Sequence, residues 1–383
     1  MRIPASPQRR VALEFAASSF ARDEKKPRRF RDSLSSVEVA DGGRTLFLGV
    51  DETVNAAPTI ERLSQAGDGY AAHEPLEVQE LLSLPDAHPK KGRIREVDIE
   101  GLAACGGYLW LVGSHSCRRK KPKRRDAAED IARLASVELE QNRVLLGRIP
   151  IVEGARGSTL AKHDGPRRSA QLEDDLRRVL EDDALLGPFL RPYKTAEGKH
   201  VSIPGKDNGF DIEGIVVKPG DAQADRVFLG LRGPVLRGWA TVLEIAPRSA
   251  DKPSHLVLSP LGGSDRRYRK HLLELDGLGI RDLRADGDDL LILAGPTMTL
   301  DGDIALYRWL GGLCDAGGDT VTPLAPGRLE RVLSLPRGEG DDRPEGFVVL
   351  PSGELLVVYD SPAEHRLTGE HAVFADVFHL PPR

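Results

Sequence analysis

The phrase Asp-Ile-Glu-Gly occurs twice in this chain, at 98–101 and at 211–214, and this recurrence constrains the fold more than any other feature. Each copy leads into an apolar run, a turn that contains Gly or Asp, and a second apolar run. That order is typical of a β-hairpin. Looser copies begin at Leu34, Leu278 and Pro344. Internal recurrence of this kind predicts a fold built by repetition of one unit.

Each hairpin is followed by one or two further strand-like runs that end near Leu-Pro or Leu-Gly. Two plus two strands, repeated around an axis, form the blade of a β-propeller. We therefore predict one all-β domain over residues 1–383, a β-propeller of five blades with six as the alternative. The long interval between the second and third units holds an insertion or a degenerate blade. A pair of β-sandwiches gives no reason for the Glu-Gly recurrence, and a β-helix needs a much shorter period.

Residues 118–204 interrupt the β pattern and predict a basic loop followed by a short helical insertion. The segment 126–136 is expected to be a helix with a capping box formed by Asp126 and Glu129. The segment 169–186 is expected to be a longer amphipathic helix, because Leu172, Leu176 and Leu180 share one stripe before Gly187-Pro188.

Composition narrows the class of protein. Hydrophobic residues make up 40% of the 383 residues and charged residues 30%, which is typical of a folded, water-soluble chain. No apolar run approaches the ~20 residues that cross a bilayer. The first residues lack the apolar core of a secretory signal, and three Cys are too few for a disulfide framework, so we expect a cytoplasmic protein without membrane contact. A net charge of −5 gives no general attraction to nucleic acid.

Several longer phrases carry a family resemblance. They are Gly-Lys-Asp-Asn-Gly-Phe-Asp-Ile-Glu-Gly from Gly205, Phe-Leu-Gly-Leu-Arg-Gly-Pro-Val-Leu-Arg-Gly-Trp-Ala from Phe228, and Leu-Ala-Gly-Pro-Thr-Met from Leu293. Together they resemble the bacterial domain-of-unknown-function family 3616 (DUF3616) over nearly the whole chain. That resemblance implies no established reaction. The Asp-x-Glu-Gly hairpins are also similar to those of esterase-like phytase propellers, a likeness at the level of fold alone.

A propeller places the start of each inner strand and the end of the next strand on one face of the disc. We therefore expect several charged side chains to converge at one mouth of the central channel. Those at the starts of inner strands are Glu100, Glu213, Glu345, Arg281 with Asp282, and Ser35 or Ser36. Those at the ends of second strands are Asp51, His115, Arg232 and Asp360. Asp98 and Asp211 precede the inner strands as turn residues. Such a cluster predicts a ligand or metal site.

The residue types suggest a chemistry for this mouth. Clustered carboxylates could hold Ca²⁺ or Mg²⁺, Arg232 and Arg281 could clamp an anionic small molecule, and a carboxylate or His115 could activate water. The hypothesis is a cation-assisted phosphoester or ester hydrolase, or a binder of an anionic small molecule. Two alternatives stay open: the repeated Glu-Gly could be purely architectural, and Arg232 could form an inter-blade salt bridge to one of the Glu residues.

The competing hypothesis is a non-catalytic interaction scaffold. Seven cations lie in the run 118–125, and their mutual repulsion predicts an exposed, mobile loop. This run and the helix expected at 169–186 could dock a protein or another acidic partner. No aromatic residues are interleaved for base stacking, which argues against single-stranded nucleic acid. An enzyme predicts an open acidic mouth, whereas a scaffold predicts a plugged channel and an exposed apolar patch elsewhere.

Overall fold

The computed structural model describes residues 3–17, 29–90, 92–124, 126–195, 198, 200–220, 224–262, 265–298 and 300–382. Strands dominate this part of the chain, and its helices are short. The prediction of an all-β, propeller-like fold is confirmed. Within these residues no helix is long and apolar enough to span a bilayer.

The strand pairing groups into five antiparallel meanders. The first contains β2 (Leu34–Ala40), β3 (Thr45–Val50), β4 (Thr59–Ala66) and β5 (Gly69–Glu77). The second contains β6 (Ile99–Cys105), β7 (Tyr108–Gly113), β10 (Leu146–Gly154), β11 (Gly157–Leu160) and β14 (Ala170–Leu172). The third contains β17 (Asp211–Lys218), β18 (Arg226–Leu236), β19 (Trp239–Ser249) and β21 (Tyr268–Glu274), with β20 (His255–Ser259) and β25 (Thr320–Thr322) at its edges.

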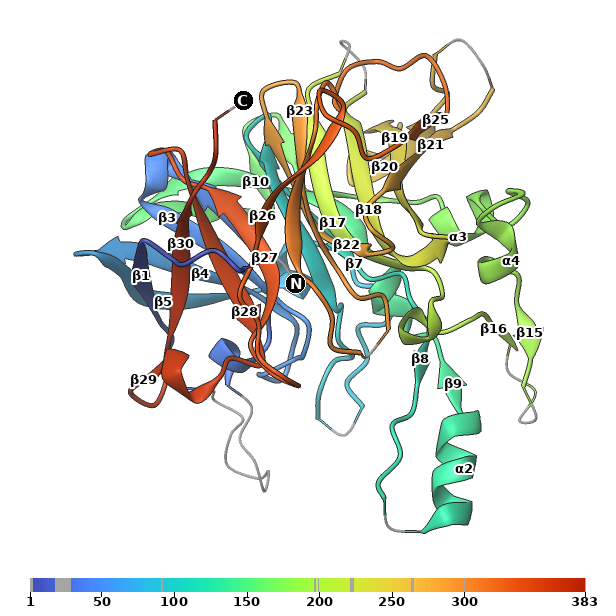
Figure 1. Cartoon of the computed structure of the whole chain (residues 1–383), viewed down its shortest axis with the longest axis horizontal. Helices are drawn as coiled ribbons and strands as arrows, with labels where there is room; N and C mark the ends of the chain where they lie inside the picture. Colours follow the sequence, from blue (N-terminus) through green and yellow to red (C-terminus); the bar gives the residue numbers. More distant parts are fainter. Residues whose placement is uncertain are drawn as a thin grey trace.

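The fourth meander contains β22 (Gly279–Asp286), β23 (Asp289–Gly295), β24 (Ala305–Trp309) and β26 (Leu329–Ser334). The fifth contains β27 (Arg343–Val349), β28 (Glu354–Asp360), β30 (Ala372–His379) and β1 (Arg9–Glu14), with β29 (Leu367–Thr368) beside β30. The strand nearest the amino terminus thus completes the last meander. Figure 1 shows this closure, with dark blue β1 lying beside red β30.

The five inner strands form a closed ring, because β2, β6, β17, β22 and β27 each contact the next and β27 contacts β2. Five separate hydrophobic layers fill the space between neighbouring meanders. In the layer between the first and second meanders, for example, Phe47 packs with Leu102 and Leu109. A four-stranded meander with an apolar layer on each face is the repeating unit that the recurrent hairpins predict. The number of blades, five with six as the alternative, stays a prediction, which these five meanders support.

The segment 118–138 forms an arm rather than a simple loop. It consists of β8 (Arg118–Arg119), α2 (Ala127–Ala135) and β9 (Val137–Glu138), and Figure 1 shows α2 projecting well away from the sheets. The helix predicted at 126–136 is confirmed, because the Asp126 carboxylate caps α2 by accepting a hydrogen bond from the Glu129 backbone. Most of the predicted basic run is described, and Arg125 lies outside the described residues.

The amphipathic helix predicted over 169–186 is wrong. Its first residues pair as β14 with β10 and β20, and helical structure is confined to α3 (Leu176–Val179) and, after the segment, α4 (Gly187–Leu190). Of the predicted stripe, Leu176 and Leu180 are buried and Leu172 is partly buried, but they join the layer between the second and third meanders. The spacing of apolar residues correctly indicated a buried face. At the start of the segment, however, pairing with neighbouring strands overrode the helix propensity.

Candidate functional site at the mouth of the channel

Each inner strand carries a β-bulge one or two residues after its start. A bulge inserts an extra residue that the partner strand does not match, and it re-aims a side chain. The five bulge positions hold Ser35, Glu100, Glu213, Arg281 and Glu345. The register expected from the sequence therefore holds in all five meanders.

The Gly that follows each bulge Glu has an architectural reason. A Cβ on Gly101 would lie 2.8 Å from Ile215 Cγ2, and one on Gly346 would lie 2.8 Å from the Ser36 Cα. At Gly214 the nearest atoms belong to Leu283 of the fourth meander, at 3.0 Å. Neighbouring inner strands thus approach each other closely at this Gly. The Gly half of the repeated phrase is explained by packing, whereas the Glu half faces the mouth.

On one side of the mouth the Glu residues are paired with arginines. Arg232 Nη1 lies 2.5 Å from Glu213 Oε1. Arg281 Nη1 lies 2.6 Å from Glu345 Oε1 and 3.3 Å from Glu213 Oε2, so it links three meanders. Both guanidinium groups are buried. The sequence left two roles open for Arg232, an anion clamp or an inter-blade salt bridge, and the structure pairs it with Glu213 of its own meander. Arg281 is the residue that pairs with Glu across meanders.

On the other side of the mouth, Glu100 and Asp51 lack such partners. Glu100 makes no hydrogen bond or ion pair with the described residues, and Asp51 Oδ1 is buried without a hydrogen-bond partner there. Burial and the neighbouring negative charges of Asp98 and Glu213 raise the pKa of Glu100 well above its usual range. Burial, with Asp360 and Asp98 nearby, raises the pKa of Asp51 well above its usual range. This side therefore resists full ionisation.

Asp211 and Asp360 complete the cluster at its edges. Burial, reinforced by the charge of Glu213, raises the pKa of Asp211 to about 7, although Arg232 opposes that rise. Burial also raises the pKa of Asp360, whose carboxylate lies 3.9 Å from Arg343. A carboxyl with a pKa near neutrality can both give and take a proton under physiological conditions.

Two basic residues of the mouth were missed by the sequence analysis. Arg143 Nη1 lies 2.7 Å from Asp98. Lys206, in the 3₁₀ turn Gly205–Asp207, is exposed and forms no ion pair with the described residues. Its charge acts on carboxyls from four different meanders, namely Asp51, Asp98, Asp211 and Asp360. Lys206 lies within the Gly-Lys-Asp-Asn-Gly phrase, which was the available signal, but no local pattern says that this turn reaches the mouth.

Two predicted site residues have their contacts elsewhere. The His115 side chain is buried against the carbonyl of Gly113, and burial lowers its pKa to about 4, so the imidazole is neutral. Asp282 is fully buried, and it accepts hydrogen bonds from Arg284 and from the Phe347 backbone. The structure therefore does not bring His115 or Asp282 into contact with the bulge carboxyls.

The channel is crossed below the mouth. Arg284, on β22 of the fourth meander, donates a hydrogen bond to the carbonyl of Val37 on β2 of the first meander. The fifth meander lies between these two in the ring, so the guanidinium group spans the axis. This hydrogen bond therefore links two inner strands that are not neighbours in the ring.

The carboxyls do not form a ready metal cage. Among the described residues no group of three His, Cys, Asp or Glu side chains is arranged to hold a metal ion. Glu213 and Glu345 are held by arginines, which leaves Glu100 as the bulge Glu without a counter-ion in the described part of the chain. The proposed set Glu100, Glu213 and Glu345 therefore does not act as a preformed ligand set for Ca²⁺ or Mg²⁺.

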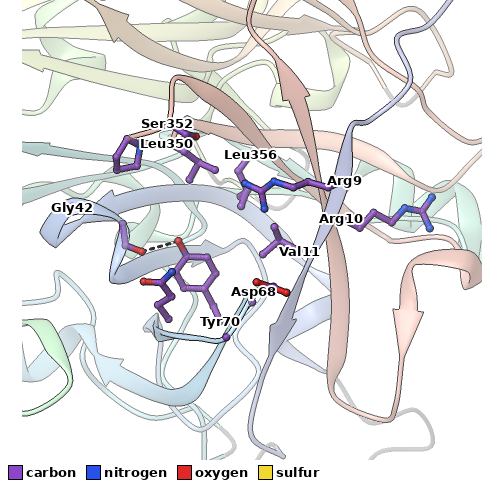
Figure 2. Close-up of a pocket in the computed structure, with 14 residues that line it drawn as sticks. Arg9, Arg10, Val11, Gly42, Asp68, Tyr70, Leu350, Ser352 and Leu356 are labelled. Carbon is purple, nitrogen blue, oxygen red and sulfur yellow. Dashed lines mark hydrogen bonds between the residues drawn. The ribbon is translucent and has the colours of Figure 1, made fainter.

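A separate pocket of about 620 Å³ lies at the seam where β1 closes the ring. It is lined by Tyr70, by the turn after β2 at Gly42, and by the turn after β27 at Ser352. Figure 2 shows Arg9 extending toward this pocket and Arg10 pointing away from it. The turns that line this pocket follow the inner strands β2 and β27, whereas the bulges lie near the starts of those strands. The seam pocket therefore does not include the predicted site residues.

Comparisons with known proteins agree on family and leave the activity open. A family model described as "Protein of unknown function (DUF3616)" matches residues 33–376. No curated protein matches the sequence. Among solved structures, a protein described as an oxidoreductase (glucose dehydrogenase) from Thermus thermophilus is similar, with 16% identity, coverage of 92% of this chain and 84% of that one, and a TM-score of 0.36. The endosialidase of phage phi92 is similar at 8% identity, with coverage of 98% and 70% and a TM-score of 0.35. At these scores neither likeness bears on function.

Proposed function

Since this chain belongs to the DUF3616 family, whose description gives no reaction, we propose a function from the geometry of the mouth: it binds a small cationic molecule. The observation that carries the proposal is the excess of carboxyls on the side formed by the first and second meanders. Glu100 and Asp51 have no ion-pair partner among the described residues, and burial and mutual repulsion oppose their ionisation. A bound positive charge relieves that repulsion.

The chemistry of the mouth favours an organic cation over a bare metal ion. A dehydrated Ca²⁺ needs six to eight oxygen ligands in close contact, and no such set is preformed in the described residues. An ammonium group needs only two or three acceptors, which Glu100 and Asp51 could supply. An anionic ligand could meet the exposed Lys206, but to reach Arg232 or Arg281 it would have to displace Glu213 or Glu345 from these buried arginines. The anion expected from the sequence is therefore the less supported ligand.

Calorimetric titration of the purified chain tests this proposal. The probes are 1,4-diaminobutane, Ca²⁺, Mg²⁺ and inorganic phosphate. We expect the diamine to bind, its affinity to fall about tenfold or more in Glu100→Gln, and no change in Glu153→Gln, an exposed carboxylate on β10. Binding of phosphate without binding of any cation would overturn the proposal and return the arginines to the role of anion clamps.

Hydrolysis is a second candidate function, and the pKa of Asp211, at about 7, is the observation that favours it. A carboxyl poised near neutrality suits general acid–base chemistry. A panel of phosphoesters and carboxyesters, assayed with Ca²⁺, Mg²⁺ or a chelator, tests it. Turnover that is lost in Asp211→Asn and kept in Glu153→Gln would establish an enzyme, whereas turnover that persists in Asp211→Asn would exclude this residue as its acid or base.

The scaffold hypothesis is supported by the arm. Ile131 is 68% exposed and Leu134 is 43% exposed on one face of α2, an apolar face that packs against nothing described. The basic run contributes less charge than expected, because Arg118, Arg119, Lys120 and Lys123 each pair with an acidic side chain of the chain itself. We propose that a protein partner takes the apolar face of this helix in a groove. If the Ile131→Glu variant no longer binds the protein partner but still binds the diamine at the mouth, the two functions are separate.

A further inference from the structure

A cavity of about 190 Å³ lies in the second half of the channel, where residues of all five inner strands line it. Its wall is largely aliphatic and includes Ala103, Ile215 and Val348. Two charged side chains, Glu38 and Arg284, also line it. The bulge residues of the mouth are absent from this lining. The cavity is therefore a place distinct from the acidic mouth.

The hydrogen bonds of the two charged residues leave the Nε donor of Arg284 unused. Glu38 accepts hydrogen bonds from the backbone N–H of Val39 and of Ala104, one on each carboxyl oxygen. Arg284 is only 5% exposed and gives its terminal nitrogens to Asp282, Leu283 and Val37. Its Nε is buried and has no partner in the described residues. A buried guanidinium N–H without an acceptor is costly, so an acceptor in the cavity would stabilise it.

We propose that this cavity is a second ligand site, which takes a small neutral molecule with an aliphatic body and one oxygen acceptor for Arg284 Nε. The carboxyls of Glu38 and Asp282 lie close to Arg284 and would repel an anion. The positive charge of Arg284, which lines the same cavity, would repel a cation. A cavity of about 150 Å³ accommodates benzene in another protein, so this one suits a ligand of roughly six to eight non-hydrogen atoms.

Saturation-transfer NMR on the full chain tests this site, with cyclohexanone as the acceptor-bearing probe and cyclohexylamine, cationic at neutral pH, as its matched control. We expect cyclohexanone to bind with a Kd of about 1 mM, in line with the energy available to so small a ligand. The amine should give no signal from this site. Glu100→Gln should leave cyclohexanone binding unchanged, because the mouth is a separate site.

Cavity-filling variants supply the decisive comparison. Ala285 and Ala104 line the cavity and are exposed, so Ala285→Leu and Ala104→Leu add volume there without altering the buried layers. Loss of the cyclohexanone signal in both variants, with unchanged thermal unfolding, would support the site. An equal signal in the parent and both variants, no signal in the parent, or equal displacement by the amine would overturn it.

Discussion

The two copies of Asp-Ile-Glu-Gly have different surroundings, although their sequences are identical. Glu213 is held by Arg232 and Arg281, whereas Glu100 has no counter-ion among the described residues. Both occupy the same bulge of an inner strand. The repeat therefore fixes where the carboxylate lies, and the neighbouring meanders decide its role. One half of the mouth is a structural ion-pair network, and in the other half Glu100 and Asp51 have no ion-pair partner among the described residues.

Among the variants considered, removal of Arg281 should lower the free energy of unfolding most, because this arginine is shared by two Glu residues of the paired half. Arg281→Met leaves Glu213 and Glu345 without their shared cation in a buried setting, which costs about 3–5 kcal/mol of unfolding free energy. Urea unfolding measures this loss. Arg9→Met, which removes a partly exposed pair with Glu354, should cost less than about 1 kcal/mol. Equal losses in the two variants would show that the paired half is not a structural network.

Substitutions of Gly101 and Gly214 test the close approach of inner strands, which is common to the paired and the unpaired half of the mouth. Gly101→Ala and Gly214→Ala should each cost about 1–3 kcal/mol, because the added Cβ meets the next inner strand. Gly318→Ala is the matched control, since nothing lies near its added Cβ. Thermal unfolding reports the differences. A large loss in one Gly-to-Ala variant only would mean that the ring packs differently on its two sides.

The sequence was sufficient to predict which strand positions form this site, but it did not predict most of the ion pairs between the side chains there. Strand alternation and the Glu-Gly recurrence were sufficient to place Glu100, Glu213 and Glu345 in one register. The pairing of Arg281 with Glu345 depends on which meanders are neighbours, and Lys206 reaches the mouth through an insertion with no local signal. His115 follows a strand end as predicted, yet its side chain turns to the carbonyl of Gly113.

Removal of the two equivalent carboxylates should have opposite effects on stability. Glu100→Gln relieves repulsion, so we expect a gain of about 1 kcal/mol near pH 8. Glu213→Gln leaves two buried arginines undercompensated, so we expect a loss. Parallel urea titrations of the two variants give the signs. Two losses would mean that Glu100 has a stabilising partner in solution.

The pH dependence of stability should be smaller and have a defined sign. Asp211 has a pKa of about 7 in the folded chain and about 3.9 when unfolded, so the folded state binds the proton more tightly. Its stabilising contribution is fully present below about pH 4 and is lost as the pH rises through about 7. The stability of Asp211→Asn relative to the parent should therefore increase from about pH 5 to about pH 8. Asp183, whose pKa of about 2 is lowered by Lys270, titrates below this window. A constant difference between variant and parent would contradict the raised pKa of Asp211.

The most direct test of the account is the proton balance of cation binding at the mouth. Calorimetry of the diamine near pH 7, in two buffers of different ionisation enthalpy, measures protons released or taken up on binding. The raised pKa values of Glu100, Asp51 and Asp211 predict net proton release, because a bound cation favours their ionised forms. Release should diminish in Glu100→Gln. Binding without proton release, or with proton uptake, would contradict the claim that the unpaired half of the mouth is the cation site.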